Sequence, residues 1–226
     1  MRTKLLLATA LSAIALVSSA TAANLVVNGD FEAGYTGFGS DYAIHVPTVN
    51  QAEYSITTSP SLVHPQFASF GDHTTGLGNM MVVNGAPSTT ARVWYENGIG
   101  VSQNTTYFFS TWIRSAINTS PAQLNFSINM NGIGMTFTAG TVASGWQQFY
   151  TTWNSGSASA ANIALVNQNT AFSGNDFALD DIVLDTIQPG GTSVVPEPAT
   201  WAMMIMGFGA AGAALRRRAR AYVRIA

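Results

Sequence analysis

The chain has 226 residues, of which 47% are apolar and 9% are charged, and it contains no cysteine. The lack of cysteine excludes a disulfide framework, a thiolate metal site and a cysteine nucleophile. Seven of the nine basic residues lie in the first four and last eleven positions, so residues 24–185 hold ten carboxylates against two arginines, a net charge of −8. Nucleic acids and anionic lipids are bound by clustered Lys and Arg, so we expect neither as a partner of this central region.

Residues 1–23 have the three parts of a secretory signal peptide. Arg2 and Lys4 give a positive start, residues 5–17 are apolar, and Ala20-Thr21-Ala22 supplies the small-residue cleavage site. The apolar run is shorter than the roughly 20 residues that a membrane span requires. We therefore expect a signal helix, export, and cleavage after Ala22 or Ala23.

Residues 24–185 consist of short runs of alternating apolar and polar residues, separated by Gly, Asn, Ser and Pro. This pattern is typical of an all-β fold, and we expect one antiparallel β-sandwich of the jelly-roll kind. The expected strands are 54–57, 79–83, 91–95, 106–114, 123–130, 134–137, 146–153, 162–166 and 176–185.

The run from Gln123 to Asn131 alternates most clearly, with apolar side chains at every second position. Its other face carries Asn125, Ser127 and Asn129, whose amides and hydroxyls can donate to and accept from sugar hydroxyls. Asn125 and Asn129 are therefore candidate carbohydrate-binding residues. The alternative is an ordinary solvated strand face.

Most tryptophans of a sandwich are expected in its core, but an exposed indole makes a flat apolar platform for a sugar ring. Trp94 and Trp112 are the candidates for such a platform, because each shares a strand face with polar or charged neighbours.

Two short motifs resemble those of a known fold family. The opening Asn28-Gly29-Asp30-Phe31-Glu32 and the closing Leu179-Asp180-Asp181-Ile182 are similar to the galactose-binding-like jelly roll of many carbohydrate-binding modules. The resemblance implies that the two motifs lie side by side. It also implies a structural Ca²⁺ with Glu32 and Asp180 as side-chain ligands, Asp30 or Asp181 as alternates, and backbone carbonyls completing the shell.

We expect Asp180 and Asp181 to face opposite sides of their strand, because successive strand residues alternate. A buried carboxylate without a metal or partner is costly, so at least one of them requires such a partner. The alternative is that both lie at an exposed strand end.

The C-terminal region has three parts. Residues 186–198 form a Pro/Gly-rich linker, residues 199–215 carry no charge, and residues 216–226 contain five arginines. Seventeen helical residues extend about 26 Å, a minimal transmembrane helix, and the arginines favour a cytoplasmic tail.

Pro196-Glu197-Pro198, followed by Trp201-Ala202, the apolar stretch and the arginines, resembles the PEP-CTERM sorting signal in its PEPxxWA variety. The resemblance implies that an exosortase cuts near the Pro-Glu-Pro, and that the chain is first anchored in the inner membrane of a Gram-negative bacterium and then reaches the cell surface or extracellular matrix. Two prolines around one Glu also favour an extended, accessible segment.

The sequence thus predicts an exported, non-catalytic protein that binds or organises extracellular polysaccharide. Neither His-Glu-x-x-His nor Gly-x-Ser-x-Gly is present. A structural or adhesive matrix protein is the alternative. A glycoside hydrolase stays open, because the distance between two carboxylates is not visible in a sequence.

Overall fold

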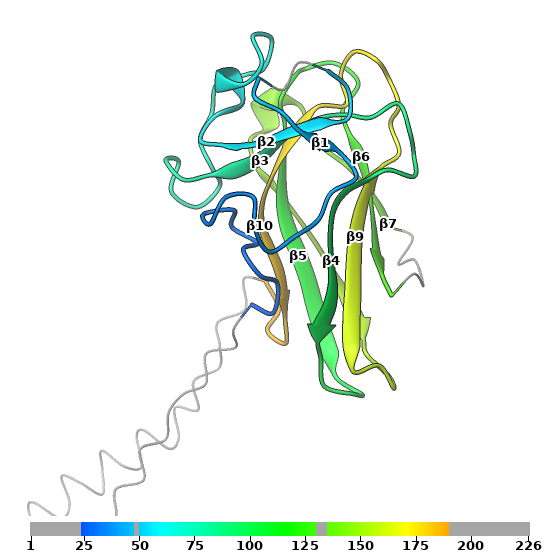
Figure 1. Ribbon diagram of the computed structural model, residues 1–226. Helices are drawn as coiled ribbons and strands as arrows, with labels where there is room; N and C mark the ends of the chain where they lie inside the picture. Colours follow the sequence, from blue (N-terminus) through cyan, green and yellow to red (C-terminus); the bar gives the residue numbers. More distant parts are fainter. Residues whose placement is uncertain (1–23, 48–49, 130–134, 190–226) are drawn as a thin grey trace, which may run out of the picture. The chain divides into compact units, whose positions relative to one another are not determined.

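Residues 24–47, 50–129 and 135–189 are described by a computed structural model (Figure 1). Their elements are β1 (Ala43–Ile44), β2 (Glu53–Thr57), η1 (Pro60–Leu62), β3 (Met80–Asn84), β4 (Arg92–Gly100), β5 (Thr106–Ser115), β6 (Gln123–Ile128), β7 (Met135–Thr138), η2 (Val142–Ser144), β8 (Gln147–Asn154), β9 (Ala160–Asn167) and β10 (Phe177–Asp185). All nine strands expected from the sequence are present. The two-residue β1 was missed because it is too short to show an alternating pattern.

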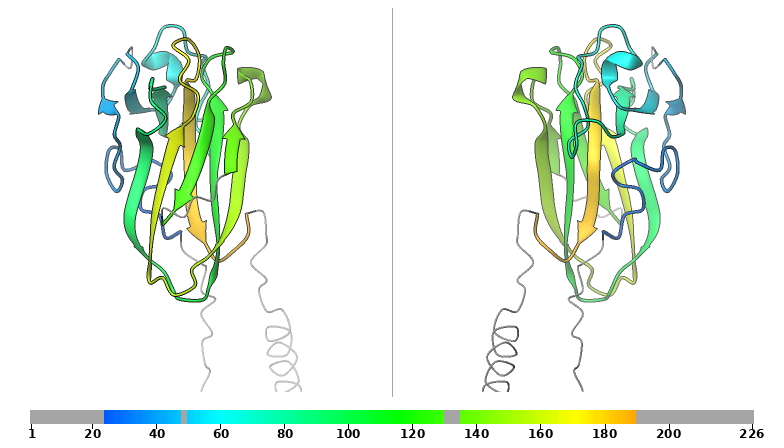
Figure 2. Two further views of the ribbon diagram at one scale, coloured as in Figure 1. Left: turned by 90° about the vertical axis from the view of Figure 1, so that its right-hand side faces the viewer. Right: turned by 90° about the vertical axis from the view of Figure 1, so that its left-hand side faces the viewer.

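Two sheets face each other, as Figures 1 and 2 show. One has the strand order β1-β2-β3-β10-β5-β8 and the other β4-β9-β6-β7. From β3 onward the antiparallel pairs are nested: β3 with β10, β4 with β9, β5 with β8, and β6 with β7. Nested pairing of eight strands is the jelly-roll arrangement, which confirms the predicted fold class.

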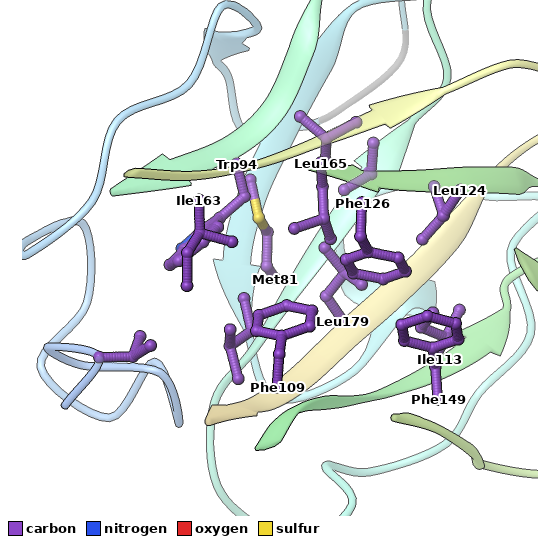
Figure 3. Packing of buried hydrophobic residues seen from close by; sticks show 14 of the residues in the cluster. Met81, Trp94, Phe109, Ile113, Leu124, Phe126, Phe149, Ile163, Leu165 and Leu179 are labelled. Carbon is purple, nitrogen blue, oxygen red and sulfur yellow. The ribbon is translucent and has the colours of Figure 1, made fainter. Parts of the chain in front are cut away.

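The core between the sheets follows the alternation of the strands (Figure 3). Leu124, Phe126 and Ile128 of β6 are buried, while the intervening Asn125 and Ser127 are half-buried on the outer face. The rings of Phe126 and Phe149 stack 4.3 Å apart between the sheets. The binary pattern of the sequence therefore decides which face of each strand enters the core.

A second, smaller cluster lies on the outer face of the six-stranded sheet. Val63 and Phe67, from the segment between β2 and β3, pack against Met80, Val82 and Ala178. This segment covers part of the sheet face and brings the loop after it, residues 71–79, against β10. That contact positions the site described next.

The segment before β1 runs along β10. Leu184 donates its backbone N–H to the Asn24 side chain, and Leu25 donates its own to the Leu184 carbonyl. Ile182 donates to the Gly29 carbonyl. The opening and closing motifs thus lie side by side, as their resemblance implied.

Candidate functional site: an acidic pocket beside a His–Trp stack

An acidic pocket of about 200 Å³ lies where β10 meets the opening segment and the loop before β3. It brings the predicted Glu32 and Asp180 together, along with both alternates, Asp30 and Asp181. Its lining is Asp30, Glu32, Asp72, Thr74, Thr75, Gly78, Asp180 and Asp181. Half of the ten carboxylates of residues 24–185 therefore line one pocket.

Sequence reasoning missed Asp72, which organises the loop on the pocket wall. Its carboxylate accepts backbone N–H bonds from Thr74 (3.1 Å), Thr75 (2.8 Å) and Gly78 (2.7 Å). Burial opposes ionisation of Asp72, but these bonds and the Thr75 hydroxyl outweigh it and lower its pKa. The run Asp72-His73-Thr74-Thr75-Gly76 is a turn signal that could have revealed this role.

Gly78 lets the opening segment approach this loop. Glu32 Oε1 accepts a 2.7 Å bond from the Asn79 backbone N–H. A β-carbon on residue 78 would lie 2.2 Å from the same Oε1. Glu32 therefore ties the first motif to the loop through a direct hydrogen bond.

Asp180 and Asp181 do not face opposite sides of the strand, so that prediction is wrong. The register of β10 against β5 shifts between Asp180 and Val183, and Asp181 has a φ of 48°. This bulge turns both carboxylates toward the pocket and leaves Ile182 in the core.

Asp180 is almost fully buried and accepts bonds from the backbone N–H groups of His73 (2.8 Å) and Asp181 (2.8 Å). Burial raises its pKa to about 7, and the negative charges of Asp181 and Asp72 add to the rise. A cation in the pocket would favour the ionised form of this carboxyl group.

His73 joins the acidic pocket to Trp112. Its Nδ1 lies 2.6 Å from Asp181 Oδ2, and its ring stacks on the Trp112 indole with 3.7 Å between centroids and 15° between planes. The Trp146 indole stands edge-on to His73 and donates to the Gly71 carbonyl. Trp112 is thus half-buried with one ring face covered by His73, and it is not the open platform that we expected.

Trp94 is a core residue, so its predicted role as an exposed platform is wrong. Its side chain is 0% exposed and lies among the labelled core residues of Figure 3. The register against β9 shifts between Arg92 and Trp94, which breaks the alternation and buries both Val93 and Trp94. An irregularity of this kind is invisible to a period-2 pattern.

Asn125 and Asn129 lie on the outer side of the four-stranded sheet, but their surroundings differ. Asn125 pairs in register with Val166 of β9 and Thr136 of β7. Asn129 accepts from the Asn162 backbone N–H (2.8 Å) and donates to the Ala160 carbonyl (3.0 Å). Asn129 is therefore engaged in closing the end of the β6–β9 pair.

The pocket suits a hard cation in its chemistry, since its walls supply carboxylate oxygens. Within residues 24–47, 50–129 and 135–189, no three His, Cys, Asp or Glu side chains are grouped closely enough to hold a metal ion. The site expected from the resemblance needs only Glu32 and Asp180, with carbonyls for the rest, and both line the pocket. A Ca²⁺ site with these two carboxylate ligands stays a prediction.

The sorting residues Pro196, Glu197, Pro198, Trp201 and Ala202 and the predicted terminal helices lie outside the described residues. No helix of the described part is long and apolar enough to cross a membrane. Residues 194–218 match the family described as the PEP-CTERM protein-sorting motif. The chain carries a PEP-CTERM sorting motif. No curated protein matches the chain in sequence.

Among solved structures, the sandwich is similar to three sugar-binding proteins, at 10–17% identity. The EclA C-terminal domain, a sugar-binding protein, is 17% identical with a TM-score of 0.37; the match covers 41% of this chain and 66% of that one. The CBM22-1 xylan-binding domain from Paenibacillus barcinonensis Xyn10C is 14% identical with a TM-score of 0.45, covering 69% and 90%. TmCBM61, solved in complex with beta-1,4-galactotriose, is 10% identical with a TM-score of 0.46, covering 72% and 97%.

Proposed function

We propose that this protein is an exported precursor that an exosortase cleaves near Pro196-Glu197-Pro198, and that its β-sandwich is a non-catalytic binder of extracellular polysaccharide. The observation that carries the proposal is the PEP-CTERM motif at residues 194–218, placed directly after the sandwich. The order of the sequence supports it: a signal-like segment, a folded domain, the motif, an apolar stretch and a block of arginines. Until cleavage, the apolar stretch anchors the precursor in the inner membrane.

The sorting step is tested by replacing Glu197 with Ala in the producing bacterium. Wild-type protein is expected to lose its C-terminal tail, while the variant keeps the tail and stays in the membrane fraction. Glu96→Ala, a change of the same type within the sandwich, serves as the control and should be processed normally. An unchanged mature mass for Glu197→Ala would contradict exosortase processing at this motif.

Polysaccharide binding is supported by the character of the outer faces. Asn125 and Ser127 present uncharged polar groups beside the small Ala164 and Val166, a surface that can exchange hydrogen bonds with sugar hydroxyls. Arg92 is paired with Asp41 through two 2.8 Å bonds, so its charge is already compensated. With ten carboxylates against two arginines, residues 24–185 favour a neutral polymer over an anionic one such as a nucleic acid.

The binding proposal is tested with the processed protein and polysaccharide from the producing bacterium. Retention on the immobilised polymer, without release of reducing sugar, is expected. Self-association by light scattering without retention would replace the proposal with a structural or adhesive matrix protein. Release of reducing sugar would replace it with a glycoside hydrolase.

We also propose that the acidic pocket binds Ca²⁺, with Glu32 and Asp180 as side-chain ligands and Asp30 or Asp181 as alternates. The pocket lies between the opening segment, the loop of Asp72 and the β10 bulge. A divalent cation there would neutralise part of the negative charge that these carboxylates share and would strengthen the attachment of the loop. Its role would be structural.

A further inference from the structure

A second cavity, of about 300 Å³, lies at the end of the sandwich where β2 and β10 begin and where β3 and β5 end. Figures 1 and 2 show the strands that meet at this end. This is the opposite end of β10 from Asp185 and the linker that follows it. The cavity is lined by Asn50, Gln51, His64, Gln66, Asn84, Ile117, Phe172, Ser173, Gly174 and Asp176. None of these residues belongs to the acidic pocket.

The loop that forms one wall is held in place by asparagine side chains. Asn175 is 1% exposed and donates to the Asn169 carbonyl (2.7 Å), while Asn167 donates to the Asn175 carbonyl (3.1 Å). The Asn175 backbone N–H donates to the Ser120 carbonyl. These bonds fix the position of the following residue, Asp176.

Asp176 supplies a buried carboxylate. It is 7% exposed, and its Oδ1 accepts a 3.0 Å bond from the Gly85 backbone N–H. Gln51 also lines the cavity, and its Nε2 is buried without a hydrogen-bond partner among the described residues.

Phe172 stands at the rim with 87% of its side chain exposed. An exposed aromatic face beside a polar cavity matches a ring that is apolar on one face and carries hydroxyls around its edge. The described residues that line the cavity include no Lys or Arg, and burial lowers the pKa of His64, which keeps that imidazole neutral near pH 7. Asp176 therefore meets no cation in this lining, and the cavity offers an acidic sugar or a phosphate no positive charge to pair with.

We propose that this cavity binds one neutral or amino hexopyranose, at a chain end or side branch of the polysaccharide. Asp176 accepts bonds from sugar hydroxyls, and Phe172 stacks on the C–H face of the ring. The volume is at the lower end of the roughly 300–1,000 Å³ of small-molecule sites, which suits one sugar unit better than a chain lying along a groove. The inference rests on the proposed polysaccharide binding and assigns it a place and a sugar class.

The test uses processed wild-type protein and the variants Phe172→Ala and Asp176→Asn, with polysaccharide from the producing bacterium as the probe. Tyr150→Ala is the matched control, because Tyr150 is also an exposed aromatic (49%) but lies on β8, away from the cavity. Each cavity variant is expected to bind at least tenfold more weakly, and the control within twofold of wild type. Free glucose, galactose or glucosamine should compete with the polymer, whereas glucuronate should not.

The outcomes separate the two proposals. If wild type binds the polysaccharide and both cavity variants bind equally well, the cavity assignment is overturned while polysaccharide binding stands. If glucuronate competes best, the neutral-sugar assignment is overturned. If wild type shows no retention at all, the proposed function itself fails. Thermal unfolding of each variant shows that a loss of binding does not come from a loss of fold.

Discussion

The carbonyl oxygen of Ile182 occupies the position in which a side chain on residue 29 would begin: a β-carbon there would lie 2.0 Å from it. The contact is backbone against backbone, and Ile182 also donates its N–H to the Gly29 carbonyl. It joins the opening segment to the β10 bulge, so the two carboxylates of that bulge and Glu32 meet in one pocket.

Gly29→Ala is therefore expected to destabilise the sandwich. Neither backbone can move away without breaking the Gly29–Ile182 bond, and overpacking of this kind costs about 1–3 kcal/mol or more. Gly100→Ala is the control, because a β-carbon there meets nothing within 4 Å. Chemical denaturation should separate the two variants, and equal stabilities would show that the opening segment is not held as described.

Ca²⁺ is expected to raise the melting temperature of wild-type protein, and a chelator to lower it. At 100 times the dissociation constant, a ligand that binds only the folded state adds about 2.7 kcal/mol. Glu32→Gln should reduce this response, whereas Asp41→Asn, which alters a carboxylate outside the acidic pocket, should keep it. A melting temperature that ignores both Ca²⁺ and chelator would eliminate the proposed metal.

Asp176→Asn should change how stability depends on pH. Burial raises the pKa of Asp176 to about 7, so between about pH 4 and 7 the folded protein holds this proton more tightly than the unfolded chain. The group's stabilising contribution is therefore complete below about pH 4 and is lost as the pH rises through 7. Tyr42 and His64 face Asp176. Burial raises the pKa of Tyr42 to about 12 and lowers the pKa of His64, so both groups stay neutral near pH 7.

The Asn side chain keeps the shape of Asp176 without the charge. We expect the variant to have the same free energy of unfolding as wild type near pH 4 and a free energy higher by on the order of 1–3 kcal/mol at pH 8. Each pKa unit corresponds to about 1.4 kcal/mol, and water in the cavity reduces the effect. Urea unfolding at pH 4.5, 6 and 8 measures this difference. A constant offset across these pH values would show that Asp176 does not titrate as described.

Trp94→Ala is expected to cost about 3–5 kcal/mol of unfolding free energy, because it leaves a large cavity in the core. Tyr150→Ala, at an exposed site, should cost less than about 1 kcal/mol. The measurement is again denaturant unfolding. A small loss of unfolding free energy for Trp94→Ala would indicate that Trp94 is exposed, and its predicted role in stacking on a sugar would be open again.

His73→Ala should uncover one face of Trp112. Acrylamide quenching of tryptophan fluorescence is expected to increase, while the loop keeps the backbone bond from residue 73 to Asp180. His64→Ala is the control, since the His64 ring packs on Phe67 and touches no tryptophan. Unchanged quenching would mean that the stacked arrangement does not persist in solution.

The sequence by itself determined the fold class and predicted that the opening and closing motifs of the sandwich lie side by side. Apolar and polar residues alternate along strands such as the one containing Leu124, Asn125 and Phe126. This pattern shows which face of a strand is buried, because successive side chains of a strand point to opposite sides. The carboxylates of the two short motifs also met in one pocket, as their resemblance to a known fold implied. The sorting motif could be found because its function depends on a short, contiguous stretch of chain.

Only the tertiary structure decided which side chains each site contains. Bulges at Trp94 and at Asp181 break the period of two, so one predicted platform entered the core and two adjacent carboxylates came to one side. A loop folded across the sheet brought Asp72 to the acidic pocket and His73 to Asp181. The second cavity joins residues as distant in sequence as Gln51 and Asp176. Contacts of this kind depend on strand order and loop path, which no local pattern of residues specifies.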